Sequence, residues 1–128
     1  MNKKILITAC LLGFIGVAIG AFAAHGLKNL ITEASLKSFE TGVRYQMYHA
    51  FLLLFLGTTN FVTTKIKRYV YGLVVGGVAL FSFSIYALAT NSLTVFNFKT
   101  IGFITPIGGV LLLTAWAILI VCFIRQKQ

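Results

Sequence analysis

Four long apolar segments limit how this chain can fold. Three of them, residues 5–24, 69–89 and 101–124, contain no Asp, Glu, Lys, Arg or His. An α-helix of about 20 residues rises about 1.5 Å per residue, enough to cross the roughly 30 Å hydrocarbon core of a bilayer. The fourth segment, residues 46–62, is shorter and holds one histidine, His49, and no charged residue. The pattern predicts an all-α fold, a bundle of four membrane-spanning helices.

The predicted spans cover residues 5–24, 45–62, 69–89 and 105–124. We expect Gly26 to close the first span in a left-handed conformation. We expect residues 63–68 to form a tight basic turn before the third span. Thr105 and Pro106 are expected to be the cap and the first residue of the last helix, where proline is tolerated.

Residues 32–44 have a different, amphipathic pattern. Charged residues recur at spacings of three and four on one helical face, and apolar residues recur on another. The charged set is Glu33, Lys37, Glu40 and Arg44. We expect a helix at the membrane interface, between the first two spans, that is capped by Thr32 and bends into the second span near Gly42. Glu40 and Arg44 are four residues apart and can pair.

Small residues mark one face of two spans, and such faces let helices approach closely in lipid. The predicted packing residues are Gly13, Gly16 and Gly20 in the first span and Gly72 and Gly76 in the third.

Composition leaves no room for a separate soluble domain. Of 128 residues, 59% are hydrophobic and 10% are charged, against about 25% charged in soluble domains. We therefore expect residues 1–128 to form a single integral membrane domain, with membrane lipids as partners and homo-oligomerisation as an open possibility. The cysteines, Cys10 and Cys122, lie inside apolar segments and are expected to be packing residues.

The net charge of +9 does not indicate a nucleic-acid-binding protein, because the basic residues sit at the ends of the apolar segments, where they anchor helices. Seven of the eleven Lys and Arg fall on the side that holds both termini. These are Lys3, Lys4, Lys65, Lys67, Arg68, Arg125 and Lys127. The asymmetry predicts a cell-membrane protein with both termini in the cytoplasm.

Polar residues gather toward the opposite ends of the spans. The candidate cluster is His25, Tyr45, Gln46, His49, Ser84, Tyr86 and Thr105. His49 lies about one turn inside the membrane from Arg44, and an ionisable residue there is a functional-site hypothesis. Structural interpretations stay open, with His25 bonding to helix-end carbonyls and His49 joining helices. We expect His25, Tyr45 and His49 to share one hydrogen-bond network.

Catalytic and cofactor sites are poorly supported by the spacing of these residues. His25, His49 and Glu40 lack any HExxH-like spacing, so no metal is expected, and a single histidine pair is weak support for haem. A nucleophile and base would require Ser84 to reach His49 through tertiary packing. The sequence has no phosphate-binding loop or dinucleotide fingerprint, and no cofactor is expected.

Several linked motifs resemble those of a known family. Residues 20–27, Gly-Ala-Phe-Ala-Ala-His-Gly-Leu, and residues 41–50, Thr-Gly-Val-Arg-Tyr-Gln-Met-Tyr-His-Ala, resemble the paired motifs of the DUF423 membrane-protein family. Residues 81–86 and 105–110, with Trp116, are similar to its third-helix and fourth-helix motifs, although Phe83 stands where the family usually has glycine. The resemblance implies a small four-helix integral membrane protein with animal relatives in the transmembrane protein 256 group. It assigns no activity.

Three interpretations of function remain. The leading one is a non-enzymatic membrane module that binds a lipid or a partner, or that assembles as an oligomer. The first alternative is a small transporter or channel that uses His49 in proton or solute coupling. The second alternative is a membrane-embedded enzyme or haem protein.

Overall fold

The computed structural model describes residues 1–95, 97 and 102–127, and within these residues every regular element is helical. This confirms the all-α prediction. The long helices are α1 (Asn2–His25), α2 (Glu33–Thr58), α3 (Thr64–Val78) and α5 (Ile104–Ile124). The short elements are the 3₁₀ turns η1 (Leu27–Asn29) and η3 (Asn91–Leu93), the π-helix η2 (Ala79–Phe83) and α4 (Ser84–Ala89).

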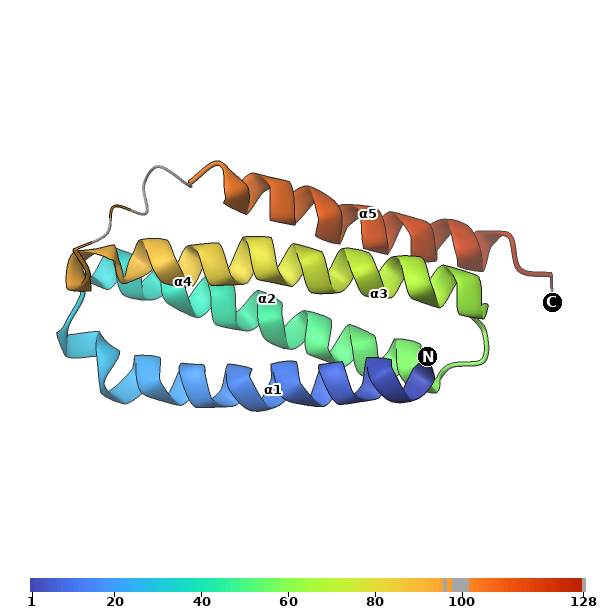
Figure 1. Ribbon diagram of the computed structural model, residues 1–128, viewed down its shortest axis with the longest axis horizontal. Helices are drawn as coiled ribbons and strands as arrows, with labels where there is room; N and C mark the ends of the chain where they lie inside the picture. Colours follow the sequence, from blue (N-terminus) through green and yellow to red (C-terminus); the bar gives the residue numbers. More distant parts are fainter. Residues whose placement is uncertain (96, 98–101, 128) are drawn as a thin grey trace.

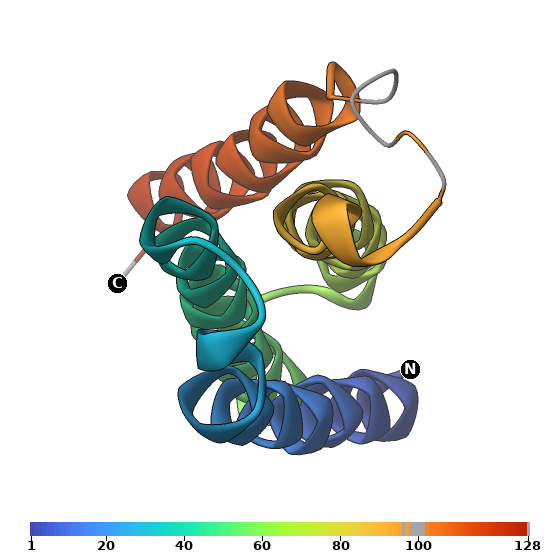
Figure 2. The ribbon, with the colours of Figure 1, turned by 90° about the vertical axis from the view of Figure 1, so that its left-hand side faces the viewer.

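The long helices run up and down along one axis. Figure 1 shows the N-terminus, the link between α2 and α3, and the C-terminus at one end of the bundle, which we call the basic end. The link between α1 and α2, the end of α4 and the start of α5 lie at the other end, which we call the far end. Viewed end-on, α3 and α4 lie on the concave side of an arc formed by α1, α2 and α5 (Figure 2).

Three parts of the fold are long and apolar enough to cross a membrane: Asn2–His25, Thr64–Ala89 and Ile104–Ile124. The fourth long helix, α2, has 26 residues, but its first half carries four charged side chains. Large apolar side chains cover the outside of the bundle, as with Phe14 at 76% and Leu113 at 71% exposure. Such a surface suits a hydrocarbon environment, since soluble monomers rarely expose large apolar patches.

The core has two apolar clusters with polar side chains between them. The larger cluster, toward the basic end, contains Leu53 and Leu56 of α2 together with buried residues of α1, α3 and α5. The smaller cluster, toward the far end, contains Ala23, Phe39 and Ala89. Along α2, the buried polar residues fall between Phe39 and Leu53. The interior therefore has a polar layer enclosed on both sides by apolar packing.

The predicted interfacial helix is not a separate element. Thr32 is the cap, as predicted, with its hydroxyl accepting from the Ser35 amide at 3.1 Å. The helix then continues without interruption past Gly42. A Cβ on Gly42 would lie 2.7 Å from the Tyr86 ring, so this glycine makes room for the tyrosine. Arg44 donates to Thr41 at 2.9 Å, a contact that replaces the expected pairing with Glu40.

Three helix ends differ from the prediction. Gly26 has a φ of −89°, in the right-handed region, because α1 passes directly into the turn η1. Residues 63–68 do not form a turn, because Thr63 caps α3, which starts at Thr64. Thr105 is not a cap, since α5 starts at Ile104 and the Thr105 hydroxyl bonds to Ser84.

Close helix contacts involve a different set of glycines from the predicted one. Cβ atoms on Gly13 and Gly72 would meet nothing within 4 Å, and on Gly20 and Gly76 only ordinary contacts. Of the predicted set, only Gly16 is tight, with a Cβ there lying 2.5 Å from the Met47 sulfur.

The tightest approach joins α5 to α3 and the π-helix. A Cβ on Gly108 would lie 2.4 Å from the Phe81 backbone nitrogen and 2.9 Å from the Gly77 oxygen. A Cβ on Gly77 would lie 3.2 Å from the Gly108 oxygen. Close backbone packing thus occurs at Gly77 and Phe81, before Phe83, whose side chain is 42% exposed.

Candidate functional site

Gln46 connects three helices at the centre of the polar layer. Its side chain is fully buried. The amide nitrogen donates to the Leu12 carbonyl of α1 at 2.8 Å, and the amide oxygen accepts from the Tyr86 hydroxyl of α4 at 2.7 Å. In lipid, where helices gain little from hydrophobic burial against one another, such bonds are a directional source of association.

His49, one turn further along α2, connects this helix to α5. Its ring is 3% exposed. The Trp116 indole N–H, which can only donate, lies 3.1 Å from Nε2, so Nε2 accepts. The Tyr45 carbonyl, which can only accept, lies 2.6 Å from Nδ1, so Nδ1 carries the proton. The surroundings thus fix a neutral imidazole in one tautomer, with both nitrogens occupied.

Two serines on the third apolar segment reach opposite neighbours. Ser82 lies in the π-helix η2, and Ser84 is the first residue of α4. Ser82 is fully buried and donates to the Gly42 carbonyl of α2 at 2.8 Å. Ser84 shares a hydrogen bond with Thr105 of α5 at 2.5 Å and also donates to backbone carbonyls of the preceding π-helix η2.

The predicted cluster therefore forms separate local groups. The structure brings together Gln46 with Tyr86, and Ser84 with Thr105, while His49 bonds to the backbone of Tyr45. The Tyr45 ring packs on Phe81 and is 39% exposed.

His25 does not join these groups. It is exposed in the last turn of α1, and among the described residues it makes no hydrogen bond. The expected single network of His25, Tyr45 and His49 is thus wrong as far as His25 is concerned.

Two residues that form hydrogen bonds in the polar layer were not part of the predicted cluster. Trp116 bonds to His49, and Ser82 bonds to α2. Trp116 is the chain's one tryptophan and lies within a predicted span. An indole N–H in hydrocarbon requires an acceptor, and this requirement is the signal that could have paired Trp116 with the intramembrane histidine.

The chemistry available to this layer is hydrogen bonding between helices. The Ser84 hydroxyl is bonded to Thr105 and to carbonyls, and His49 bonds to a carbonyl and an indole. Among the described residues, no three His, Cys, Asp or Glu side chains are grouped so that they could hold a metal ion. Every buried side-chain nitrogen and oxygen in the described part of the chain has a partner.

A groove lies beside the His49–Trp116 pair, between α2 and α5. Its volume is about 500 Å³. It is lined by Tyr48, Phe51, Leu52, Phe55, Trp116, Leu119, Ile120 and Phe123. The two helices meet here through side chains, the His49–Trp116 bond and the Phe55–Phe123 ring pair, whose centroids are 6.3 Å apart. The groove is aromatic, open at the surface and closed at its base by buried Leu52 and Leu119.

Comparison with known proteins gives a consistent set of relatives. A family model described as "Protein of unknown function (DUF423)" matches residues 19–109. A "UPF0382 membrane protein" of Haemophilus influenzae is 40% identical over 116 residues, which are 91% of this chain and 90% of the relative. The "UPF0382 inner membrane protein YgdD" of Escherichia coli is 36% identical over 130 residues, covering 99% of this chain and 94% of the relative. No solved structure matches the chain.

Proposed function

Since the chain belongs to the DUF423 family of membrane proteins, we propose that it is a non-enzymatic, four-span membrane module that binds the acyl chain of a membrane lipid between α2 and α5. The observation that carries the proposal is the aromatic groove beside the His49–Trp116 pair. The proposal has two parts, the fourth span and the lipid, and each is tested separately.

The fourth span is supported by the course of α2. Its first residue, Glu33, follows the link at the far end, and its last residue, Thr58, leads into the link at the basic end (Figure 1). It packs along α1 and also contacts α3 and α4. If its neighbours cross the bilayer, α2 crosses with them, with its charged first half toward the far surface.

A labelling experiment tests this arrangement. Asn29 and Asn60 are exposed residues on either side of α2. In a background with Cys10→Ala and Cys122→Ala, single cysteines at these two positions should react from opposite sides of the membrane. Because basic loops are retained in the cytoplasm, Asn60→Cys should react with an impermeant maleimide only after permeabilisation. Labelling of both positions from one side would refute the crossing of α2.

The lipid is favoured as occupant by the groove's shape and surroundings. Its wall residues Phe51 and Ile120 are 61% and 58% exposed, so the groove opens on the surface that faces hydrocarbon. An unfilled gap between side chains loses dispersion contacts. Rigid rings leave an irregular space, which a flexible acyl chain can follow.

The single tryptophan provides a direct measurement. Trp116 lines the groove and is 44% exposed. Phosphatidylcholine with brominated acyl chains, added stepwise to the protein in detergent, should quench Trp116 fluorescence to a plateau. Ile120→Phe fills the groove and should raise the lipid concentration needed for half-maximal quenching several-fold.

A matched substitution controls for changes in the general lipid-facing surface. Leu113→Phe adds the same ring to α5 at a site 71% exposed and outside the groove. It should leave the quenching curve unchanged. Quenching that rises in proportion to lipid without a plateau, or an equal effect of both substitutions, would indicate ordinary contact with bulk lipid and would reject the groove as a site.

The geometry of His49 favours binding over transport. Proton coupling needs a histidine that gains and loses a proton. A second proton on Nε2 would remove the acceptor for the Trp116 indole, which would be left unpaired next to the groove. The arrangement therefore supports a role in which His49 holds Trp116 in position on the groove wall.

A further inference from the structure

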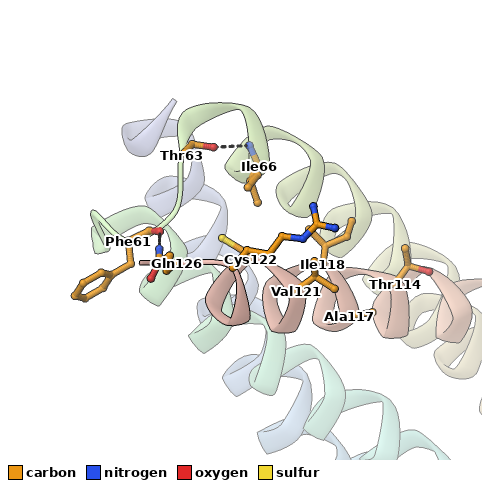
Figure 3. A pocket seen from close by; sticks show the side chains of 10 residues that line it. Phe61, Thr63, Ile66, Thr114, Ala117, Ile118, Val121, Cys122 and Gln126 are labelled. Carbon is orange, nitrogen blue, oxygen red and sulfur yellow. Dashed lines mark hydrogen bonds between the residues drawn. The ribbon is translucent and has the colours of Figure 1, made fainter. Parts of the chain in front are cut away.

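A second groove lies at the basic end, on the other face of α5. Its volume is about 500 Å³. Figure 3 shows Ile66 of α3 pointing toward α5, which contributes Thr114, Ile118 and Cys122. Phe61 and Thr63 of the link before α3 also line the groove. Arg125 and Gln126, which follow in the chain, also line it. Gln126 donates to the Phe61 carbonyl and so ties the end of α5 to the link.

The wall of this groove offers a ligand little besides apolar surface over most of its length. The Thr114 hydroxyl donates to the Val110 carbonyl of its own helix at 2.8 Å. The Thr63 hydroxyl accepts from the Ile66 amide in its role as helix cap. Between these two threonines the lining residues are Ile66, Ile118, Val121 and other apolar side chains.

The depth of the groove matches one leaflet. From Arg125 at its mouth to Thr114, α5 rises about 16 Å at about 1.5 Å per residue. Half of a hydrocarbon core of about 30 Å is about 15 Å. A lipid of one leaflet would therefore place its acyl chain in the groove and its headgroup beside Arg125.

The charge at the mouth selects the headgroup. Arg125 is exposed, and among the described residues its guanidinium makes no hydrogen bond or ion pair. Lys65 and Arg68 are exposed in the same helical turn as Ile66. The chain's only two acidic side chains, Glu33 and Glu40, lie on the first turns of α2 at the far end. The mouth is thus positive, with no acidic side chain of the described chain to neutralise it.

We propose that the groove between α3 and α5 is a binding site for an anionic phospholipid, with its acyl chain along Ile66 and Ile118 and its phosphate at Arg125. Basic pockets between helices at the cytoplasmic surface favour anionic headgroups, and each basic residue adds attraction. This site goes beyond the function proposed above, since it uses a different groove and a different headgroup.

Cys122 allows occupancy to be measured within this groove. It lines the site and is partly exposed. In a Cys10→Ala background, N-ethylmaleimide should alkylate Cys122 of the detergent-solubilised protein. Added phosphatidylglycerol should slow this reaction to a plateau at a lower concentration than phosphatidylcholine does. Arg125→Gln should raise the half-protecting concentration of phosphatidylglycerol about fivefold, close to that of phosphatidylcholine.

Two further variants separate the site from general effects. Lys3→Gln removes an equal charge at the same end of the bundle, on α1 and outside the lining, and should leave protection unchanged. Ala117→Phe occupies the groove from an exposed position and should abolish the difference between the two lipids. Trp116 fluorescence reports in each case that the fold is kept.

The outcomes are distinct. Equal protection by both lipids in the parent protein, or an equal loss of protection with Lys3→Gln and Arg125→Gln, would overturn the proposal. Protection that depends on protein concentration and not on lipid would assign the groove to a second copy of the chain and would also overturn it. Quenching of Trp116 by brominated phosphatidylcholine does not involve Arg125, so either groove can fail as a site while the other stands.

Discussion

Replacement of Gly108 by alanine is expected to destabilise the protein by about 1–3 kcal/mol, the usual cost of overpacking a tight interior. The added methyl group would lie 2.4 Å from the Phe81 nitrogen and 2.7 Å from the Leu80 carbonyl carbon. These are backbone atoms, so no side chain can rotate away, and α5 must move from the π-helix. The free energy of unfolding in mixed detergent micelles measures the effect.

Gly72→Ala is the matched control for this substitution. It introduces the same methyl group at a position of α3 where no neighbouring atom would lie within 4 Å of it. Because glycine in a helix interior is less favourable than alanine by about 0.5–1 kcal/mol, this variant should be as stable as the parent or slightly more stable. Equal losses at the two positions would contradict the close approach of α5 to η2.

Removal of the Gln46 amide is expected to have the second large effect. Gln46→Met keeps the size and shape of the side chain but leaves the Tyr86 hydroxyl without its acceptor and α2 without its bond to Leu12. A buried polar group left unpaired costs about 1–3 kcal/mol. The free energies of unfolding of the parent, Gln46→Met, Tyr86→Phe and the double variant form a double-mutant cycle. This cycle isolates the contribution of the hydrogen bond between Gln46 and Tyr86.

The double variant should lose about 1 kcal/mol less free energy of unfolding than the two single variants lose together. The reason is that removal of both partners leaves neither of them unpaired. Tyr69→Phe removes a hydroxyl from a ring that is 59% exposed, and it should change little. Strictly additive losses would show that Gln46 and Tyr86 do not stabilise each other.

Much of the fold could be predicted because lipid imposes strict demands on sequence. A chain in hydrocarbon must satisfy its backbone internally, so long uncharged segments become helices. Thr32 could be identified as a cap because its side chain acts within one turn, on Ser35. The bend at Gly42 could not be judged locally, since the reason for that glycine is the Tyr86 ring, more than 40 residues away in the chain.

The pairing of helix faces was harder to predict from spacing. Gly72 and Gly76 have the regular interval of a packing face, but the contact is made by the adjacent residue, Gly77. Consecutive glycines such as Gly76 and Gly77 place small residues on two faces at once. The π-helix that receives Gly108 widens the turn beyond this point, so a constant 3.6-residue period no longer predicts which residues face α5.

For the site, the polar residues themselves could be predicted from the sequence, but their partners could not. Gln46 and His49 could be singled out because polar groups in an apolar segment need partners. Their partners, Leu12 and Trp116, are 34 and 67 residues away, which no local pattern encodes. His25 was misplaced because a histidine at a helix end can face the aqueous surface and needs no protein partner.

Lys67 has a consequence for how the protein is assembled during synthesis. Its ammonium is buried at the basic end, where it donates to the Asn2 side chain at 3.0 Å and to the Thr59 carbonyl at 2.7 Å. Asn2 leaves the ribosome first, and the group that holds it follows 65 residues later. The bond cannot form until the whole of α2, which lies between Asn2 and Lys67 in the chain, has been synthesised. The start of α1 therefore becomes attached to the start of α3 only after α2 has been made.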